Sequence, residues 1–197
     1  FLGGGLRGQA KKDANTQQRE TVVGSFYCPS RRAPSGRQGM EPCYNAEIPT
    51  NEGKSDYAAN GGPAAIGTGR GPLPDFQTFS DCAGKFPNCD WAAGGNPSDS
   101  QINDQFRGIV THRTGASIRQ VSDGTSNTLM AGEKFMDPTF YEVNTLLDPA
   151  QWGKDNPGDN SSCWQGYDQD TVRWPAQARL PTRDEVGKAQ AYAHYMG

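Results

Sequence analysis

The sequence predicts a single α+β domain with an antiparallel sheet and long, disulfide-braced loops that cover one face. Its 197 residues suit one domain with a core of its own and are too few for two. The 25 Gly and 14 Pro require many turns and long connections, whereas eight Phe, seven Tyr and four Trp favour a packed core over disorder. Along residues 128–135 the side chains divide into two alternating sets, one for each face, as they do in a β-strand.

The first half of the chain contains few predicted elements. Residues 9–14 favour a short, exposed helix without an apolar stripe. Residues 21–28 concentrate β-branched and aromatic side chains, which predicts a strand or a buried approach to the core. A second short strand is expected at 55–60, after a loop at 30–54. Residues 61–105 are predicted to form a long, turn-rich insertion.

The second half carries the clearest patterns. Residues 106–110 favour a short strand, and 116–121 a single helical turn that leads into the turn at Asp123-Gly124. Thr182 and Glu185 have capping-box spacing, which predicts a late helix. The best strand, 128–135, places one set of side chains on each face: Leu129, Ala131, Glu133 and Phe135 on the first, and Thr128, Met130 and Lys134 on the second.

The five cysteines indicate disulfides more than metal binding, since there is no Cys-x-x-Cys and there are only two histidines. Cys82 and Cys89 flank a short turn-rich loop, and Cys28 with Cys43 would clamp a second one. Cys163 has no obvious partner. The alternative is five reduced thiols in a cytosolic protein, and one sequence does not determine the pairing.

Charge and hydropathy exclude some partners. Nineteen basic and 22 acidic residues, interspersed along the chain, give a net charge of -3, so no nucleic-acid partner is expected. No apolar run reaches the length that spans a bilayer, and the first residues lack the pattern of a signal peptide. We therefore expect a soluble chain or a portion of a larger one.

Motifs for catalysis are weak, so no enzyme is predicted. Residues 3–8 match Gly-x-Gly-x-x-Gly, but a dinucleotide site needs a strand before it, and only two residues precede this match. Residues 124–128 lack the closing glycine of a nucleophile elbow, and no histidine is visibly coupled to Ser126. A hydrolase would require such a histidine and a pair of amides that stabilise an anion.

Two groups of residues after position 150 are candidates for binding. No cofactor is expected, although carboxylates on a polar loop could hold calcium; such clusters are more often simple turns. The carboxylates are Asp155, Asp159, Asp168 and Asp170. Large aromatic side chains could stack on a sugar or a flat ligand, although they could equally fill the core; they are Trp152, Trp164, Trp174 and Tyr167. Residues 160–162 form an N-glycosylation sequon.

Three stretches, FYCPSRR at 26–32, DYAANGG at 56–62 and the segment 118–134, together resemble a planctomycete-type family of unknown function with a prepilin-like N-terminus, also labelled a bacterial solute-binding family. Gly166-Tyr167-Asp168 with Val172-Arg173 resembles the next landmark of that family. The most specific matching residues are Asp123, Gly124, Thr125, Ser126, Asn127, Thr128, Gly132 and Glu133. Their turn chemistry suggests a structural role at the start of the strand.

The resemblance implies a pilin-like fold whose N-terminal pilin helix is not present in this chain, which would then be a middle portion truncated at both ends. It also implies export by a type II secretion or type IV pilus-like route to the cell surface or the extracellular space. No enzymatic activity is implied. If Glu133 is buried on its strand, it needs a cationic partner, for which Arg173 and Arg119 are candidates.

The function expected from these observations is a non-catalytic, extracellular pilin- or pseudopilin-like structural subunit that packs with copies of itself or with other envelope proteins. The alternative is a secreted module that binds a glycan or a small solute through the residues after position 150. A concave aromatic cleft with convergent polar groups would favour the alternative, and an assembly surface without a pocket would favour the structural subunit.

Overall fold

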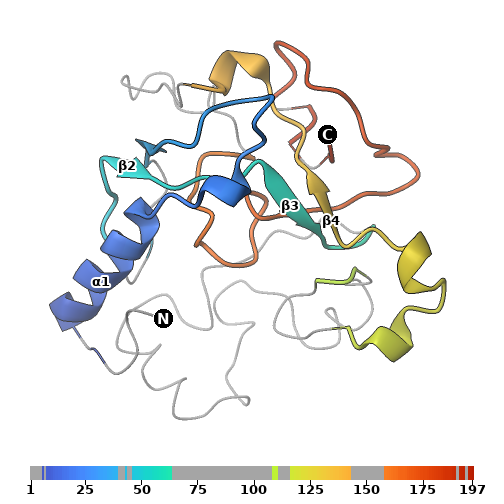
Figure 1. The fold of residues 1–197 in the computed structure, drawn as a ribbon, viewed down its shortest axis with the longest axis horizontal. Helices are drawn as coiled ribbons and strands as arrows, with labels where there is room; N and C mark the ends of the chain where they lie inside the picture. The colour runs from blue at the N-terminus through green and yellow to red at the C-terminus, as the bar shows by residue number, and fades with distance from the viewer. Residues whose placement is uncertain are drawn as a thin grey trace.

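The computed structural model of the protein describes residues 6, 8–39, 43, 46–63, 108–110, 116–142, 158–189, 191–193 and 195–197. These residues form a mixed α+β structure, which confirms the predicted class (Figure 1). Its one α-helix, α1, spans Gly8–Glu20. Its short strands are β1 (Arg37–Gln38), β2 (Asn51–Glu52), β3 (Tyr57–Asn60), β4 (Ala131–Glu133) and β5 (Val172–Arg173).

The strands form two small sheets, and one of them is not purely antiparallel as predicted. β1 and β2 pair antiparallel. In the other sheet β3 lies between β4 and β5, antiparallel to β4 with Ala58 opposite Gly132, and parallel to β5 with Ala59 opposite Val172. Parallel pairing needs a long connection between the two strands, and more than a hundred residues separate β3 from β5.

Helix α1 is longer than the helix predicted at residues 9–14. It is attached to the sheet of β1 and β2 by an ion pair and has no apolar stripe. Arg19 is its one buried residue, and it bonds Glu52 at the end of β2. The main chain continues this attachment, because Gly53 N donates to Arg19 O at 2.7 Å. Within the described ranges, no helix has the length and apolar character needed to cross a membrane.

Residues 21–28, predicted as a strand or a buried approach to the core, form no strand: the segment contains the 3-10 helix η1 (Gly24–Phe26), and its end is buried at Tyr27 and Cys28. Asp56, just before β3, sets this conformation, because its N–H donates to Phe26 O at 2.7 Å and its carboxylate accepts from Cys28 N at 2.8 Å. The predicted strand at 55–60 is confirmed as β3.

The strand predicted at 128–135 is shorter than expected and does not separate a buried face from an exposed one. Beyond β4, Lys134 forms an isolated bridge with Met196, and Gly197 N donates to Glu133 O. Lys134 and Phe135, predicted on opposite faces, are both 1% exposed. Lys134 is buried against Gly158 and Asp159, whereas Phe135 packs edge-on against the ring of Tyr192.

The remaining elements follow the sequence in part. The predicted helical turn is confirmed as η3 (Ile118–Gln120), with a capping box between Ser117 and Gln120. It is followed by a second 3-10 helix, η4 (Thr125–Asn127). The late helix after Thr182 does not form: residues 181–189 contain no helix, and turns occur only at 186–187 and 189. Residues 108–110 form no strand, and the rest of that predicted strand and most of the predicted insertion lie outside the described residues.

The structure does not support the disulfide bracing that the sequence suggested, because Cys28 and Cys43, a candidate pair, form no disulfide in it. The two sulfur atoms contact different parts of the chain. Cys28 Sγ lies 3.1 Å from Ser30 Oγ and 3.4 Å from Glu133 Oε1, whereas Cys43 Sγ lies 4.0 Å from Gln165 Oε1. Burial raises the pKa of the Cys163 thiol to about 11. Cys82 and Cys89 lie outside the described residues.

The interior of the molecule is unusually rich in charge. Six of the ten largest fully buried side chains in the described part of the chain are ionisable: Arg173, Lys54, Lys134, Glu52, Asp56 and Asp137. The apolar remainder includes Phe135, Met136, Val172 and Met196. Buried ions need partners, so the fold depends on how these groups are matched.

Gly53 is predicted to be intolerant of any side chain. A Cβ there would lie 2.2 Å from Thr21 O, a main-chain atom that cannot move alone. We expect Gly53→Ala to lower the free energy of unfolding by about 1–3 kcal/mol, as overpacking does. Gly24→Ala is the matched control, because nothing lies within 4 Å of its Cβ. Urea unfolding of both variants measures the difference, and equal effects would contradict the close contact.

Candidate functional site

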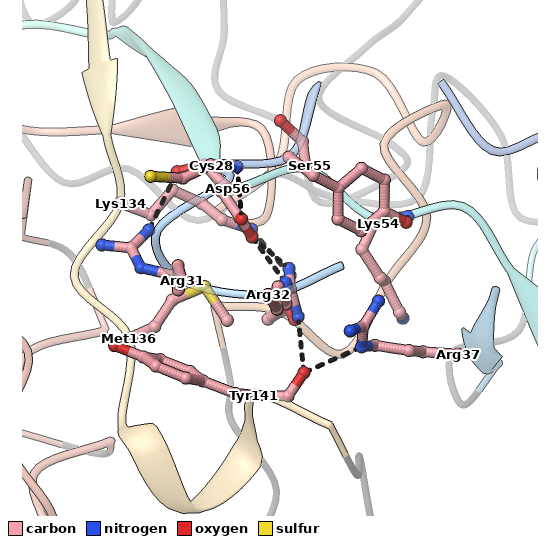
Figure 2. A network of polar contacts seen from close by, with 12 residues as sticks. Cys28, Arg31, Arg32, Arg37, Lys54, Ser55, Asp56, Lys134, Met136 and Tyr141 are labelled. Atoms are coloured by element: carbon pink, nitrogen blue, oxygen red, sulfur yellow. Dashed lines mark hydrogen bonds and ion pairs between the residues drawn. The ribbon is translucent and has the colours of Figure 1, made fainter. Parts of the chain in front are cut away.

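A connected network of buried ion pairs joins the segments that carry the family-like motifs. Figure 2 shows the part of it around Arg32 and Asp56. Arg32 is central to it. Its Nε donates to Asp56 Oδ1 at 2.6 Å, and its Nη1 and Nη2 donate to the two carboxylate oxygens of Asp159 at 2.6 and 3.1 Å. All three side chains are at most 1% exposed. One guanidinium therefore joins the turn after η1, the start of β3 and the 158–162 segment.

Lys134, just after β4, completes the pairing of Asp159. Its ammonium donates to Asp159 Oδ1 at 2.9 Å, to Gly158 O at 2.9 Å and to Asp170 O at 3.1 Å, which uses all three donors. Burial alone would raise the pKa of Asp159, but the charges of Arg32 and Lys134 hold it well below its ordinary value. Asp159 is therefore an ionised carboxylate shared by two cations.

Arg173, on β5, is fully buried and donates to main-chain oxygens. Its Nη2 bonds Gly158 O and its Nε bonds Tyr195 O, both at 3.0 Å. Position 158 must be glycine for this contact, because a Cβ there would lie 2.2 Å from Arg173 Nη2. Burial lowers the pKa of Arg173 to about 10, although Asp170 and Asp159 act in the opposite direction.

A second buried group links α1 to the sheets. Glu52 accepts from Arg19 Nη2 at 2.7 Å and from Lys54 Nζ at 2.5 Å. Tyr27 lies between the two groups: its hydroxyl accepts from Lys54 N at 2.9 Å, and the Arg32 guanidinium lies 5.5 Å from its ring centroid. Burial raises the pKa of Tyr27, so the hydroxyl is neutral.

Glu133 is paired with Arg31, not with the predicted Arg173 or Arg119. Arg31 Nη2 lies 3.2 Å from Glu133 Oε2, and its Nε lies 2.8 Å from Asp184 Oδ2. Arg173 is directed at main-chain carbonyls instead, and Arg119 lies on the exposed η3. Arg31 reaches Glu133 because the turn from Cys28 to Arg32 packs beside β4.

The most specific motif of the sequence, 123–128, lies on the surface. Gly124 has a φ of 82°, which favours glycine, and the turn is closed by Asn127 Nδ2 to Asp123 O at 2.9 Å and Thr128 Oγ1 to Gly124 O at 3.0 Å. We call residues 116–130 the signature arm. Three apolar side chains of the arm are exposed: Ile118 by 79%, Met130 by 66% and Leu129 by 45%.

The predicted calcium ligands do not converge in the described part of the chain. There, no group of three or more Asp, Glu, His or Cys side chains is placed to hold a metal ion. Asp159 is engaged by Arg32 and Lys134, while Asp168 accepts from Asp170 N within one turn. Asp155 lies outside the described residues, where calcium binding stays a prediction. The sequon at 160–162 is buried, with Asn160 9% exposed, and is inaccessible in the folded chain.

The predicted aromatic platform is divided into two separate pairs. Trp174 is 2% exposed and its Nε1 donates to Tyr167 Oη at 3.1 Å, so this pair belongs to the core. Trp164 is 38% exposed, and its ring centroid lies 6.3 Å from that of Phe26. Trp152 lies outside the described residues. An open surface groove lies elsewhere, lined by Gln38, Gly39, Ile48, Pro49, Thr50 and Asn51, none of which is ionisable.

Sequence reasoning missed the central residues of the network. Arg32, Asp56 and Lys134 all stand within the three family-like stretches, each beside aromatic or small residues. The sequence signal for such residues is a charged side chain among predicted core residues, which must find a partner if it is buried. Only for Glu133 was a partner predicted on this basis. The pairing itself had no local signal, because Arg32 and Asp159 are 127 positions apart.

Comparison with known proteins gives one match. A family model described as "Protein of unknown function (DUF1559)", with the label SBP_bac_10, matches residues 6–197. No curated protein and no solved structure shows significant similarity to the chain. The match confirms the resemblance that was predicted from the three stretches and from the motif at 123–134.

Asp159 is predicted to be the residue on which the network depends most. Asp159→Asn leaves Arg32 and Lys134 buried without their shared counterion, and we expect a loss of about 3–5 kcal/mol in the free energy of unfolding. The control is Glu47→Gln, which removes a surface ion pair with Lys12 and should cost under about 1 kcal/mol. Similar losses in chemical denaturation would contradict the assignment.

The lowered pKa of Asp159 also predicts that the stability difference between the wild-type protein and Asp159→Asn depends on pH. A carboxylate whose pKa is lowered by folding contributes stability above its unfolded pKa of about 3.9 and loses it as the pH falls through the lower folded value. The advantage of the wild-type protein over Asp159→Asn should therefore shrink in acid. An advantage that is independent of pH would mean that the charge of Asp159 is not its source.

Proposed function

Since the chain belongs to this DUF1559 family of unknown function, we propose that it is a non-catalytic structural subunit of the cell surface or of a filament, pilin- or pseudopilin-like in role. In this proposal it packs against copies of itself or against other envelope proteins. Extracellular location, reached by a type II secretion or type IV pilus-like route, is the part of the proposal that follows from the family resemblance.

The observation that carries the proposal is the apolar surface of the signature arm. Ile118 and Met130 are more than half exposed although the arm is locally ordered by its capping box and by the side chains of Asn127 and Thr128. In Figure 1 the arm, coloured yellow-green to yellow, lies on the opposite side of the molecule from α1. An ordered surface with exposed apolar side chains is typical of a protein interface.

The burial of the network supports a role without catalysis. General acids, bases and nucleophiles must reach a substrate, whereas Arg32, Asp56 and Asp159 bond one another at no more than 1% exposure. The described groove at Gln38–Asn51 offers no ionisable side chain. The charged residues of the motifs therefore fit a structural purpose, which is to hold separate segments of a rigid subunit together.

The alternative, a secreted module that binds a glycan or a small solute, has one observation in its favour. Phe26 and Trp164 form an exposed aromatic pair, and Trp164 Nε1 donates to Thr21 O at 3.1 Å, which fixes the indole at the surface. Such a face can stack on a sugar ring. The other predicted platform residues in the described part, Tyr167 and Trp174, do not join it.

The assembly role predicts that the signature arm is needed for self-association. We expect the double variant Ile118→Ser, Met130→Ser to weaken association of the native protein at least about tenfold, since two apolar side chains leave the interface. Val186→Ser is the control, because Val186 is 67% exposed but lies outside the arm. Sedimentation velocity measures the change. Equal association of the two variants, or a monomeric wild type at all concentrations, would contradict the proposal.

The exposed pair of Phe26 and Trp164 allows an experiment that distinguishes the structural role from glycan binding. Under the structural role, Trp164→Ala should leave self-association unchanged, and the wild-type protein should bind none of a panel of neutral oligosaccharides by calorimetry. If the wild type binds an oligosaccharide and Trp164→Ala loses about tenfold or more in affinity, the loss of stacking identifies a glycan-binding module instead.

A further inference from the structure

The surface groove between β1 and the start of β2 has the size and the chemistry to receive an apolar segment of another chain. Its volume is about 430 Å³, well above the roughly 150 Å³ of a cavity that holds one benzene-sized group. Ile48 and Pro49 supply apolar surface, and Ile48 is 49% exposed. Neutral amide and hydroxyl groups come from Gln38, Thr50 and Asn51. An apolar side chain that enters the groove therefore meets no charge.

Helix α1 fixes the segment that forms one wall of this groove. Glu47, just before the wall residue Ile48, donates its N–H to Thr16 Oγ1 at 2.9 Å. The carbonyl oxygen of Glu47 accepts from Arg19 Nη1 at 3.1 Å. Arg19 also pairs with Glu52, at the other end of the same segment. A binding surface that is held in place before a partner arrives loses little conformational freedom on binding.

The signature arm has the properties that match this groove. It exposes the apolar side chains of Ile118, Leu129 and Met130, and its turns are ordered by local hydrogen bonds. Its two charged residues, Arg119 and Asp123, have opposite signs. Charged residues are depleted at the centre of protein interfaces. Contact between the apolar side chains of the arm and the groove would bury no ionisable group of the groove.

The arm and the groove lie on opposite sides of the molecule. In Figure 1, β2, which contains Asn51 of the groove, lies beside α1, whereas the arm lies on the opposite side. The arm of a chain therefore does not meet the groove of the same chain, and a contact between the two surfaces joins two molecules. Two different patches in contact form a head-to-tail interface, which leaves one arm and one groove open at the ends of each pair.

We propose that the signature arm of one copy inserts Ile118 and Met130 into the groove beside α1 of the next copy, so that the protein assembles head to tail. This inference rests on the proposed structural role and specifies which two surfaces meet. A head-to-tail contact repeats from copy to copy, and it gives a ring where the rotation closes and a filament where it does not. A two-fold contact between two arms would instead stop at a dimer.

Ile48→Asp tests the groove while the arm is unchanged. The new carboxylate would be desolvated against the apolar side chains of the arm, so we expect self-association to weaken at least about tenfold. Leu180→Asp is the matched control, because it places the same charge on an aliphatic residue that is 65% exposed and belongs to neither surface. Sedimentation velocity over a range of concentrations measures both variants. Equal association of the two would show that the groove is not the receiving surface.

A mixture of two defective variants distinguishes a head-to-tail contact from an arm-to-arm contact. The double variant Ile118→Ser, Met130→Ser keeps its groove, and Ile48→Asp keeps its arm, so we expect each alone to be largely monomeric. An equimolar mixture should form a heterodimer and nothing larger, because the second arm and the second groove of that pair are both defective. Thr50→Asp, at an exposed position of the same groove, replaces Ile48→Asp if that variant does not fold. Absence of the heterodimer would overturn the inference.

The wild-type protein separates failure of this inference from failure of the structural role. Head-to-tail assembly predicts wild-type species larger than a dimer as the concentration rises. Association that needs the arm but is unchanged by Ile48→Asp, or that stops at a dimer, would overturn the head-to-tail contact and leave the structural role in place. A wild-type protein that is monomeric at all concentrations would overturn both.

Discussion

The carboxylate of Asp159, shared by two buried cations, is the contact that joins the distant segments of this structure. Arg32 and Lys134 reach it from the turn after η1 and from the end of β4, and the glycine before it accepts hydrogen bonds from Lys134 and Arg173. Short strands such as β1, β2 and β5 supply few ladder hydrogen bonds. The ion pairs supply the directional contacts that an extensive sheet would otherwise provide, at a desolvation cost that only close geometry repays.

The sequence predicted local features and missed the contacts between distant segments. The class, the helical turn at 118–120 and the strand at 57–60 followed from local patterns. The strand predicted at 21–28 failed because Asp56, a distant residue, folds that segment into a turn. The predicted partner of Glu133 failed for the same reason, since Arg31 is near it only in the folded chain. Cys28 and Cys43 had plausible spacing but unrelated surroundings.

The family-like motifs divide into two kinds by burial. The stretches at 26–32 and 56–62 place Arg32 and Asp56 in the interior, whereas residues 123–127 are exposed throughout. The buried residues of the first two stretches stabilise the interior of the molecule. The exposed residues 123–127 form a turn of defined shape beside apolar side chains. This division separates the residues that maintain the fold from those that lie at the surface.

The long separation of the ion-paired residues also determines how the chain can fold. Arg32 and Asp159 are 127 residues apart, and Arg31 and Glu133 are 102 apart. Loop closure of this length must precede any gain from these contacts, so the folding rate is limited by topology. During synthesis the core cannot close until the segment with Asp159 has left the ribosome.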